Sequence, residues 1–319
     1  MASSSQHELI IVGGGPAGLC AAMYAGRGML DTVLLERGLP GGELLNTDLV
    51  EDYPGFESIL GRDLAQKMTD HAKKFGADIQ QENVESIEKR TDGIFDVTTT
   101  RGNHFLAPAV ILSAGGAPVK LDVQGEQEYA GRGVSYCAVC YGAFFKGEVL
   151  AVVGGGDAAV EEADYLTKYA SKVYIIHRRD EFRASKLLQK RLFDNPKIEV
   201  IWNKVVTEIR GAPAGVTELA LKDTVTGDES ALPIGGVFVF IGFTPNSWLI
   251  KDHYEHDAAG YIITDSTMQT SIPGLYAAGD LRVQVTRQIT TAVGDATTAV
   301  IAIEKYLKER TPQPVQEPV

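Results

Sequence analysis

Two cysteines separated by two residues, Cys137 and Cys140, are the side chains of this sequence best suited to covalent chemistry. A dithiol of this spacing can close a small disulfide ring, and a stabilised thiolate can attack another disulfide through a mixed-disulfide intermediate. The third cysteine, Cys20, lies in an Ala-rich stretch where we expect buried packing. Three cysteines are too few for a disulfide framework, and a tetrahedral zinc ion needs four ligands. The sequence therefore predicts a redox dithiol and no metal site.

A glycine run near the N-terminus could bind a dinucleotide. The apolar residues 9–12 predict a strand, and Gly13-x-Gly15-x-x-Gly18 then opens an Ala-rich helix. Such a run allows a tight turn, close approach of a pyrophosphate, and an anion at the helix N-terminus. Glu36 ends the next predicted strand, where a carboxylate accepts hydrogen bonds from ribose hydroxyls. The alternative is an ordinary Gly-rich turn between a strand and a helix.

A second copy of this pattern follows the cysteine pair. Gly154-x-Gly156-x-x-Ala159 comes after the apolar residues 149–153, and His177 stands as far beyond Gly154 as Glu36 stands beyond Gly13. The basic run His177-Arg178-Arg179, with Arg183 nearby, replaces the carboxylate with donors and positive charge that suit a 2′-phosphate. We therefore expect NADP to be preferred over NAD at this site. The alternative is a solvated basic strand end.

Two Gly/Pro breaks, at residues 115–118 and 242–245, bracket the second pattern. Glycine frees the backbone and proline restricts the residue before it, so both breaks resemble hinges. We expect an α/β chain with a domain at 118–245 inserted into a discontinuous domain at 1–117 and 246–319. A terminal helix is predicted at about 288–308, and the Pro-rich tail at 311–319 is expected to be disordered.

Composition limits the possible partners. The 319 residues carry a formal charge of −12, which repels phosphate backbones and anionic lipid. No apolar run approaches the roughly 18 residues of a membrane span, and no basic leader opens the chain. We expect a cytoplasmic protein with no nucleic-acid or membrane partner.

A flavin would connect these parts chemically. A nicotinamide delivers a hydride, a disulfide accepts two electrons through sulfur, and an isoalloxazine can mediate between them. Two nucleotide sites and one dithiol therefore predict FAD, NADPH and a disulfide substrate.

The order of five motifs in this sequence resembles that of the low-molecular-weight thioredoxin reductases, and the resemblance covers about residues 9–307. The motifs are the first glycine run, the cysteine pair, the second glycine run, the basic stretch 177–183 and Ala-Gly-Asp at 278–280. The resemblance implies two Rossmann-like nucleotide-binding domains of the flavin disulfide reductase type, the second inserted in the first. It also implies a homodimer that transfers electrons from NADPH through FAD and the active-site disulfide to thioredoxin or a thioredoxin-like protein.

The resemblance also implies roles for individual residues. Cys137 matches the thiol that attacks thioredoxin, Cys140 the thiol beside the flavin, and Asp280 the carboxylate that holds the ribityl chain. Further positions that match FAD contacts are Gly13, Gly15, Pro16, Ala17, Gly18, Glu36, Arg37, Gly42, Glu43, Thr47, Asp52, Ala114, Gly115, Gly279, Arg287, Gln288 and Ile289. Positions that match NADPH contacts are Gly154, Gly156, Asp157, Ala158, Glu161, His177, Arg178, Arg179 and Arg183.

The main departure from the family is Tyr141, which stands where an aspartate commonly serves as acid and base. A phenol with an ordinary pKa of about 10 is a poor base at neutral pH, although it can donate a hydrogen bond. Proton transfer must use Tyr141 differently, another residue, or water. Smaller departures, which could alter the flavin potential or the polarity of its pocket, are Glu43 and Asp52 for amides, Phe243 for a histidine of some members, and Ser113-Ala-Gly-Gly116 for Ala-Thr-Gly.

Three further expectations concern partners and motion. The dithiol and the second glycine run share the inserted domain but must each meet the flavin, so we expect that domain to rotate about the two breaks. Arg132, Phe144 and Phe145 either contact thioredoxin or belong to the core. The competing functions are a ferredoxin-linked reductase, a dithiol oxidase, and a non-catalytic redox sensor.

Overall fold

The computed structural model describes residues 3–310, so the tail at 311–319 lies outside the described residues. The chain divides into two compact units, which we call unit 1 (Met1–Ala117 with Thr244–Val319) and unit 2 (Pro118–Phe243). The second boundary lies slightly before the one expected between residues 245 and 246. The connecting strands β11 (Gly116–Pro118) and β20 (Phe243–Pro245) pair as a two-stranded sheet.

Unit 1 is built on a five-stranded parallel sheet with the order β21-β10-β2-β3-β6. Its strands are β2 (Leu9–Val12), β3 (Thr32–Glu36), β6 (Asp78–Gln81), β10 (Ala109–Leu112) and β21 (Leu275–Ala277). The central strands are short apolar runs because both of their faces are covered. Leu9 and Ile11 of β2 pack with the helices, whereas Ile10 and Val12 pack with the layer on the other side.

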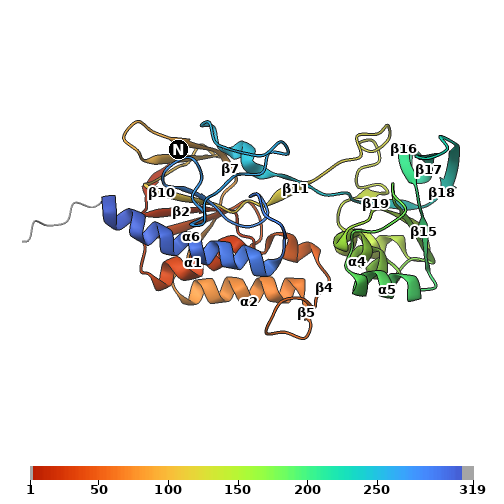
Figure 1. The fold of residues 1–319 in the computed structure, drawn as a ribbon, viewed down its shortest axis with the longest axis horizontal. Coiled ribbons are helices and arrows are strands. Elements are labelled where there is room, and N and C mark those ends of the chain that lie inside the picture. Colours follow the sequence, from red (N-terminus) through yellow and green to blue (C-terminus); the bar gives the residue numbers. More distant parts are fainter. Residues whose placement is uncertain (1–2, 311–319) are drawn as a thin grey trace, which may run out of the picture. The chain divides into compact units, whose positions relative to one another are not determined.

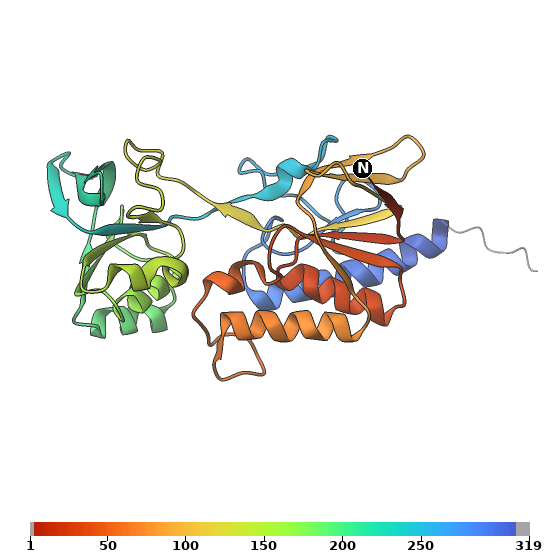
Figure 2. The same cartoon turned by 180° about the vertical axis from the view of Figure 1, so that it is seen from behind.

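Three helices lie on one face of this sheet (Figures 1 and 2). They are α1 (Pro16–Arg27), α2 (Gly61–Lys74) and α6 (Ile289–Arg310). A second sheet with the order β1-β9-β8-β7 covers the other face. Its strands are β1 (Ser4–Gln6), β7 (Val84–Lys89), β8 (Phe95–Thr99) and β9 (His104–Ala107), and unit 1 also contains β4 (Leu49–Val50), β5 (Ile59–Leu60), η1 (Gly42–Asn46) and η3 (Asn246–Leu249).

Unit 2 repeats the plan of unit 1. Its parallel sheet has the order β12-β19-β13-β14-β15, and an antiparallel sheet β16-β17-β18 accompanies it. The strands are β12 (Val134–Ser135), β13 (Val149–Gly154), β14 (Lys172–Ile176), β15 (Ile198–Ile201), β16 (Lys204–Ala212), β17 (Gly215–Asp223), β18 (Glu229–Pro233) and β19 (Gly236–Phe240). The helices are α3 (Ala138–Tyr141), η2 (Gly142–Phe145), α4 (Asp157–Leu166) and α5 (Lys186–Asp194). Along β13, Leu150 and Val152 pack with the helices, and Ala151 and Val153 pack with β16 and β17.

Among residues 3–310, no helix combines the length and apolar character needed to cross a bilayer.

Candidate active site

Cys137 and Cys140 form a disulfide at the start of α3 in unit 2. Cys137 is the N-cap residue of this short helix, and its Sγ accepts a hydrogen bond from the Cys140 N–H at 3.1 Å. Ser135 holds the peptide groups on both sides of Cys137, because its Oγ accepts from Cys137 N and donates to Cys137 O, each at 3.1 Å. The hydrogen bond to Sγ would stabilise a thiolate at Cys137 once the disulfide is reduced.

A buried carboxylate braces the segment that leads into the disulfide. Glu126 is 4% exposed and accepts hydrogen bonds from the backbone N–H groups of Leu121 and Asp122 at 2.8 and 2.7 Å. The hydroxyl of Tyr136, the residue before Cys137, donates to the same carboxylate at 2.7 Å. Burial is the largest cause of the raised pKa of Tyr136, and the bond to Glu126 adds to it. The phenol therefore remains a donor throughout the neutral range.

Tyr141 lies beside the disulfide with 42% of its surface exposed, and its ring contacts Phe144 at 6.3 Å between centroids. Within residues 3–310, no group forms a hydrogen bond with the Tyr141 hydroxyl. A side chain that relays protons to a thiol needs a directed hydrogen bond to it or to a water molecule. The geometry therefore gives Tyr141 an exposed aromatic surface and no built proton path through protein groups.

The two phenylalanines that follow have different surroundings. Phe144 is 80% exposed, whereas Phe145 packs edge-on against Phe238 of β19 at 5.7 Å between centroids. Arg132 donates hydrogen bonds to the carbonyls of Glu128 and Pro213. Of the three residues considered as a contact surface, Phe144 is therefore free to meet a partner, and Phe145 contributes to the core.

The first glycine run forms the β2–α1 turn of unit 1. Gly13 has a φ of 103°, and a Cβ at Gly18 would lie 1.8 Å from the carbonyl oxygen of Gly13, so both positions require glycine. Pro16 begins α1, whose N-terminal N–H groups are the kind that bind phosphate oxygens. Ser113 donates from its Oγ to the carbonyls of Val12 and Gly13 at 3.0 and 2.9 Å. In the sequence, the one sign of this contact is that Ser113 departs from the family pattern.

Glu36 lies at the end of β3 and faces this turn. Its Oε2 accepts a hydrogen bond from Gly14 N at 2.6 Å, and its Oε1 accepts one from Gly38 N at 2.9 Å. Gly42 lies against Gly15, since a Cβ at Gly42 would be 3.0 Å from the Gly15 Cα. The main chain of Ala114 and Gly115 accepts hydrogen bonds from Asn246. Glu36, Gly42 and Ala114 therefore lie at this turn. The predicted contacts Arg37, Glu43 and Asp52 are exposed.

Asp280 follows β21 and carries a buried oxygen that lacks a partner. Among the described residues, nothing forms a hydrogen bond with its Oδ1. Burial raises the pKa of this carboxyl group, Arg287 opposes the rise, and Glu43 and Asp295 add to it. Arg287 donates from Nε to the carbonyl of Asp280 at 3.2 Å, and its guanidinium lies 4.0 Å from the ring centroid of Tyr261. A buried acceptor without a donor fits a ligand hydroxyl, such as that of a flavin ribityl chain.

The second glycine run forms the β13–α4 turn of unit 2. Gly154 has a φ of 156°, and a Cβ there would lie 2.4 Å from the carbonyl oxygen of Phe240. Gly156 faces open space, and α4 begins at Asp157. The Asp157 carboxylate accepts from Ser185 N at 2.7 Å. Ala158 and Glu161 lie in the first turns of the same helix. The turn therefore leaves room for a ligand next to Gly156.

His177 lies beneath this turn. A Cβ at Gly155 would be 2.2 Å from the His177 ring, and the ring also contacts Phe182 and Trp202. Its Nε2 lies 3.0 Å from the carbonyl oxygen of Glu181, and burial lowers the pKa of the ring. His177 is therefore neutral at pH 7. The positive charge of the segment belongs to the exposed residues Arg178, Arg179 and Arg183.

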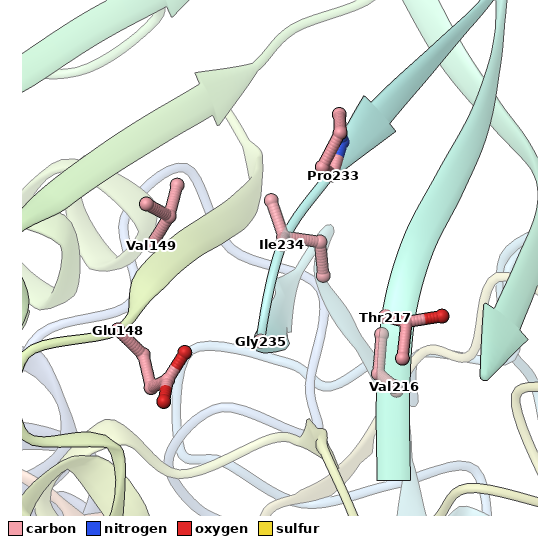
Figure 3. Close-up of a pocket in the computed structure, with 7 residues that line it drawn as sticks. All are labelled: Glu148, Val149, Val216, Thr217, Pro233, Ile234 and Gly235. Carbon is pink, nitrogen blue, oxygen red and sulfur yellow. The ribbon is translucent and has the colours of Figure 1, made fainter. Parts of the chain in front are cut away.

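A separate cavity of about 360 Å³ lies at the opposite end of β13 from Gly154. Figure 3 shows Glu148 and Thr217 on opposite sides of Ile234 and Gly235. None of the predicted site residues lines it.

Comparison with known proteins identifies the family. Residues 7–296 match the family model described as pyridine nucleotide-disulphide oxidoreductase. The thioredoxin reductase of Bacillus subtilis (strain 168) is 48% identical over 309 residues, which cover 97% of this chain and 97% of that protein.

Solved structures agree with the sequence comparison. The thioredoxin reductase of Lactococcus lactis superposes with a TM-score of 0.92 at 42% identity, covering 95% of this chain and 99% of that chain. The thioredoxin reductase of T. acidophilum gives a TM-score of 0.90 at 36% identity, covering 96% and 99%. The chain therefore belongs to the pyridine nucleotide-disulphide oxidoreductase family, within which these relatives are thioredoxin reductases.

Proposed function

We propose that this chain is an NADPH-dependent thioredoxin reductase that passes two electrons through FAD and the Cys137–Cys140 disulfide to the disulfide of thioredoxin or a thioredoxin-like protein. The observation that carries the proposal is a disulfide within a four-residue segment of a chain that also builds two glycine turns of the dinucleotide-binding type. The Bacillus subtilis and Lactococcus lactis relatives, which match nearly the whole chain, are thioredoxin reductases, and this supports the proposal. FAD, when bound, supplies the relay between a two-electron hydride donor and a disulfide.

Each unit has residues suited to one cofactor. In unit 1, the β2–α1 turn, Glu36 and Asp280 would hold FAD, with Arg287 and Gln288 near the start of α6. In unit 2, the β13–α4 turn would hold the pyrophosphate of NADPH, and Arg178, Arg179 and Arg183 would hold its 2′-phosphate. The proposal thus assigns FAD to residues 1–117 and 246–319 and NADPH to residues 118–245.

The exchange step uses the two sulfurs in turn. The Cys137 thiolate attacks one sulfur of the partner disulfide, so that a Cys137–partner disulfide forms and the other partner sulfur leaves as a thiolate. The Cys140 thiolate then attacks Cys137 Sγ, which releases the second partner thiolate and restores the Cys137–Cys140 disulfide. Both partner thiolates take up protons. Because Cys140 and Tyr141 are exposed, water can supply those protons without a carboxylate at position 141.

Three further parts of the proposal concern assembly and setting. The chain would act as a homodimer in the cytoplasm. Unit 2 would rotate about the linking strands so that NADPH and the disulfide reach the flavin alternately. Each unit contributes a glycine at positive φ to the linking region, Gly115 at 55° and Gly242 at 129°.

Anaerobic titration tests the proposed function. NADPH should bleach the flavin absorbance of the purified protein, NADH should do so poorly, and addition of oxidised thioredoxin should restore the colour. Failure to bleach with excess NADPH would favour a ferredoxin-linked reductase or an oxidase. Bleaching that no disulfide protein reverses would favour a sensor.

Replacing Phe144 with alanine should raise the KM for thioredoxin about 10-fold while kcat changes less than about 2-fold, because an exposed aromatic side chain beside the disulfide can anchor the partner. Steady-state kinetics with thioredoxin as the varied substrate measures this. Phe193→Ala removes another exposed aromatic side chain, on α5, and should leave KM unchanged. An unchanged KM in Phe144→Ala would contradict the assignment.

Replacing Tyr141 with phenylalanine should leave kcat/KM and its pH profile unchanged within about 2-fold, because no described group forms a hydrogen bond with the hydroxyl. The measurement is kcat/KM for thioredoxin across pH 5.5–9.5, with NADPH saturating. Loss of one limb of the profile in Tyr141→Phe would show that the phenol transfers a proton.

A further inference from the structure

The turn that carries Asp280 is held by side chains from outside it. Gly279 N–H donates to Asp295 Oδ2 at 3.1 Å, and Gly279 C=O accepts from Gln284 Nε2 at 3.1 Å. Gly279 has a φ of 84°, and a Cβ there would lie 3.2 Å from the Cβ of Ala17. Both polar groups of the residue before Asp280 are therefore fixed, while Asp280 Oδ1 remains buried and unpaired among the described residues.

Asp295 is an unusual residue for its place in α6. It lies at the buried face of this 22-residue helix, whose neighbouring core positions are Ala292, Ala296 and Ala299. Its carboxylate also meets Arg282 Nη1 at 3.3 Å, and the two side chains are 11% and 14% exposed. Burial raises the pKa of Asp295, while the bond from Gly279 and the charge of Arg282 oppose that rise.

A buried ion pair contributes little net stability, since desolvation offsets much of the attraction. Arg282 is itself held by Thr264, which accepts from its Nε at 3.0 Å. The packing of α6 against α1 uses small apolar side chains and needs no carboxylate at position 295. Asp295 supplies two things that an alanine would not, namely a partner for the Arg282 guanidinium and an acceptor for the N–H of Gly279. An asparagine keeps only the second of these.

We propose that Asp295 and Gln284 are positioning residues that lock the Gly279 peptide, so that Asp280 Oδ1 is presented to a hydroxyl of the bound flavin. The inference rests on the proposed function, because it needs FAD in unit 1. Without Asp295, the Gly279 N–H becomes a buried donor with no acceptor one residue from the Asp280 carboxylate. The turn then gains other arrangements, and binding must select the competent one.

The variants separate this role from mere stabilisation of α6. In Asp295→Asn the amide oxygen still accepts from Gly279 while the charge opposite Arg282 is lost, so FAD affinity should stay within about 3-fold of the parent chain. Asp295→Ala removes the acceptor and should weaken FAD binding about 10-fold. Gln284→Glu removes the donor to Gly279 C=O at nearly constant size, and it should weaken binding by a similar factor. Thr298→Ala, on the exposed face of α6, is the control and should leave binding unchanged.

The measurement is the Kd of the full-length apoprotein for FAD, followed by flavin fluorescence, together with the apoprotein Tm. Weaker binding in Asp295→Ala and Gln284→Glu, with Asp295→Asn close to the parent, supports the inference. A lowered Tm with an unchanged Kd in both Asp295→Ala and Gln284→Glu overturns it and leaves only a structural role. If Asp295→Ala does not fold, Gln284→Glu decides by the same criterion. Failure of the parent chain to bind FAD overturns the proposed function, and this inference with it.

Discussion

Serine in place of either Cys137 or Cys140 is expected to lower thioredoxin reduction with NADPH by roughly a factor of 10³ or more, because neither variant can form the disulfide between these residues. NADPH should still bleach the flavin absorbance in both variants, since the nucleotide turns are intact. Steady-state turnover and anaerobic absorbance measurements separate the two effects. Either variant working at the parent rate would exclude the proposed electron path.

Cys20 provides the matched control for these substitutions. It is a buried free thiol of α1 that donates from Sγ to the carbonyl of Val293 at 3.4 Å. A serine hydroxyl can make the same bond, so Cys20→Ser should retain turnover. A large loss of turnover in Cys20→Ser would mean that removal of any thiol damages the enzyme. The losses in the Cys137 and Cys140 variants would then not support a role for the disulfide.

The two cysteine variants should differ when a partner is trapped. Residue exposure favours attack through Cys140, which is exposed, whereas Cys137 is half-buried. The hydrogen bond from Cys140 N stabilises a thiolate at Cys137, and the thiolate is the attacking species. We therefore expect Cys140→Ser to accumulate a mixed disulfide with a thioredoxin that lacks its own resolving cysteine and whose remaining cysteine is activated as a disulfide with an aryl thiol, because attack by Cys137 then expels the aryl thiolate. Accumulation in Cys137→Ser alone would reverse the assignment.

Alanine at both Arg178 and Arg179 is expected to raise the KM for NADPH about 100-fold and to change the KM for NADH less than about 3-fold. A hydrogen bond to a charged group contributes roughly 1.5–3 kcal/mol, and each of these exposed arginines should contribute near the lower limit, which is about 10-fold. NADH has no 2′-phosphate, so the loss of these contacts should have little effect on its KM. Initial rates with each nucleotide, at saturating thioredoxin, measure the change.

A distant charge provides the control for this prediction. Lys168 is an exposed cation just beyond α4, at the opposite end of that helix from Gly156. Lys168→Ala changes the net charge by one unit without touching the proposed phosphate site, so its KM for both nucleotides should stay unchanged. An equal loss for NADPH and NADH in the double arginine variant would place the arginines outside 2′-phosphate recognition.

The features that sequence predicted well are those set by local chain geometry. Gly13, Gly18 and Gly154 could be recognised by spacing because a side chain there meets backbone atoms or an unfavourable φ. The α/β class and the family followed from the order of such motifs, and the comparisons confirm both.

Features set by packing between distant segments were not visible in the sequence. Asp295 meets Gly279 only because α6 folds back on the β21 turn, whereas Gln284 lies just five residues from Gly279 and reaches it from the same loop. The buried position of His177 depends on its contacts with Phe182 and Trp202. The basic residues 177–183, which look like one cluster in the sequence, therefore divide into a buried neutral ring and exposed arginines. Tyr141 departs from the family pattern, which is visible in the sequence. That its hydroxyl has no hydrogen-bond partner among the described residues is visible only in the structure.

Glu126 gives unit 2 a mechanical property. Its carboxylate ties Leu121 and Asp122, just beyond the first linking strand, to Tyr136 next to Cys137. One carboxylate thereby joins the two ends of the segment between Leu121 and Tyr136 by hydrogen bonds. In the proposed rotation of unit 2, these hydrogen bonds would make the segment beside the first linking strand and the segment beside the disulfide move together.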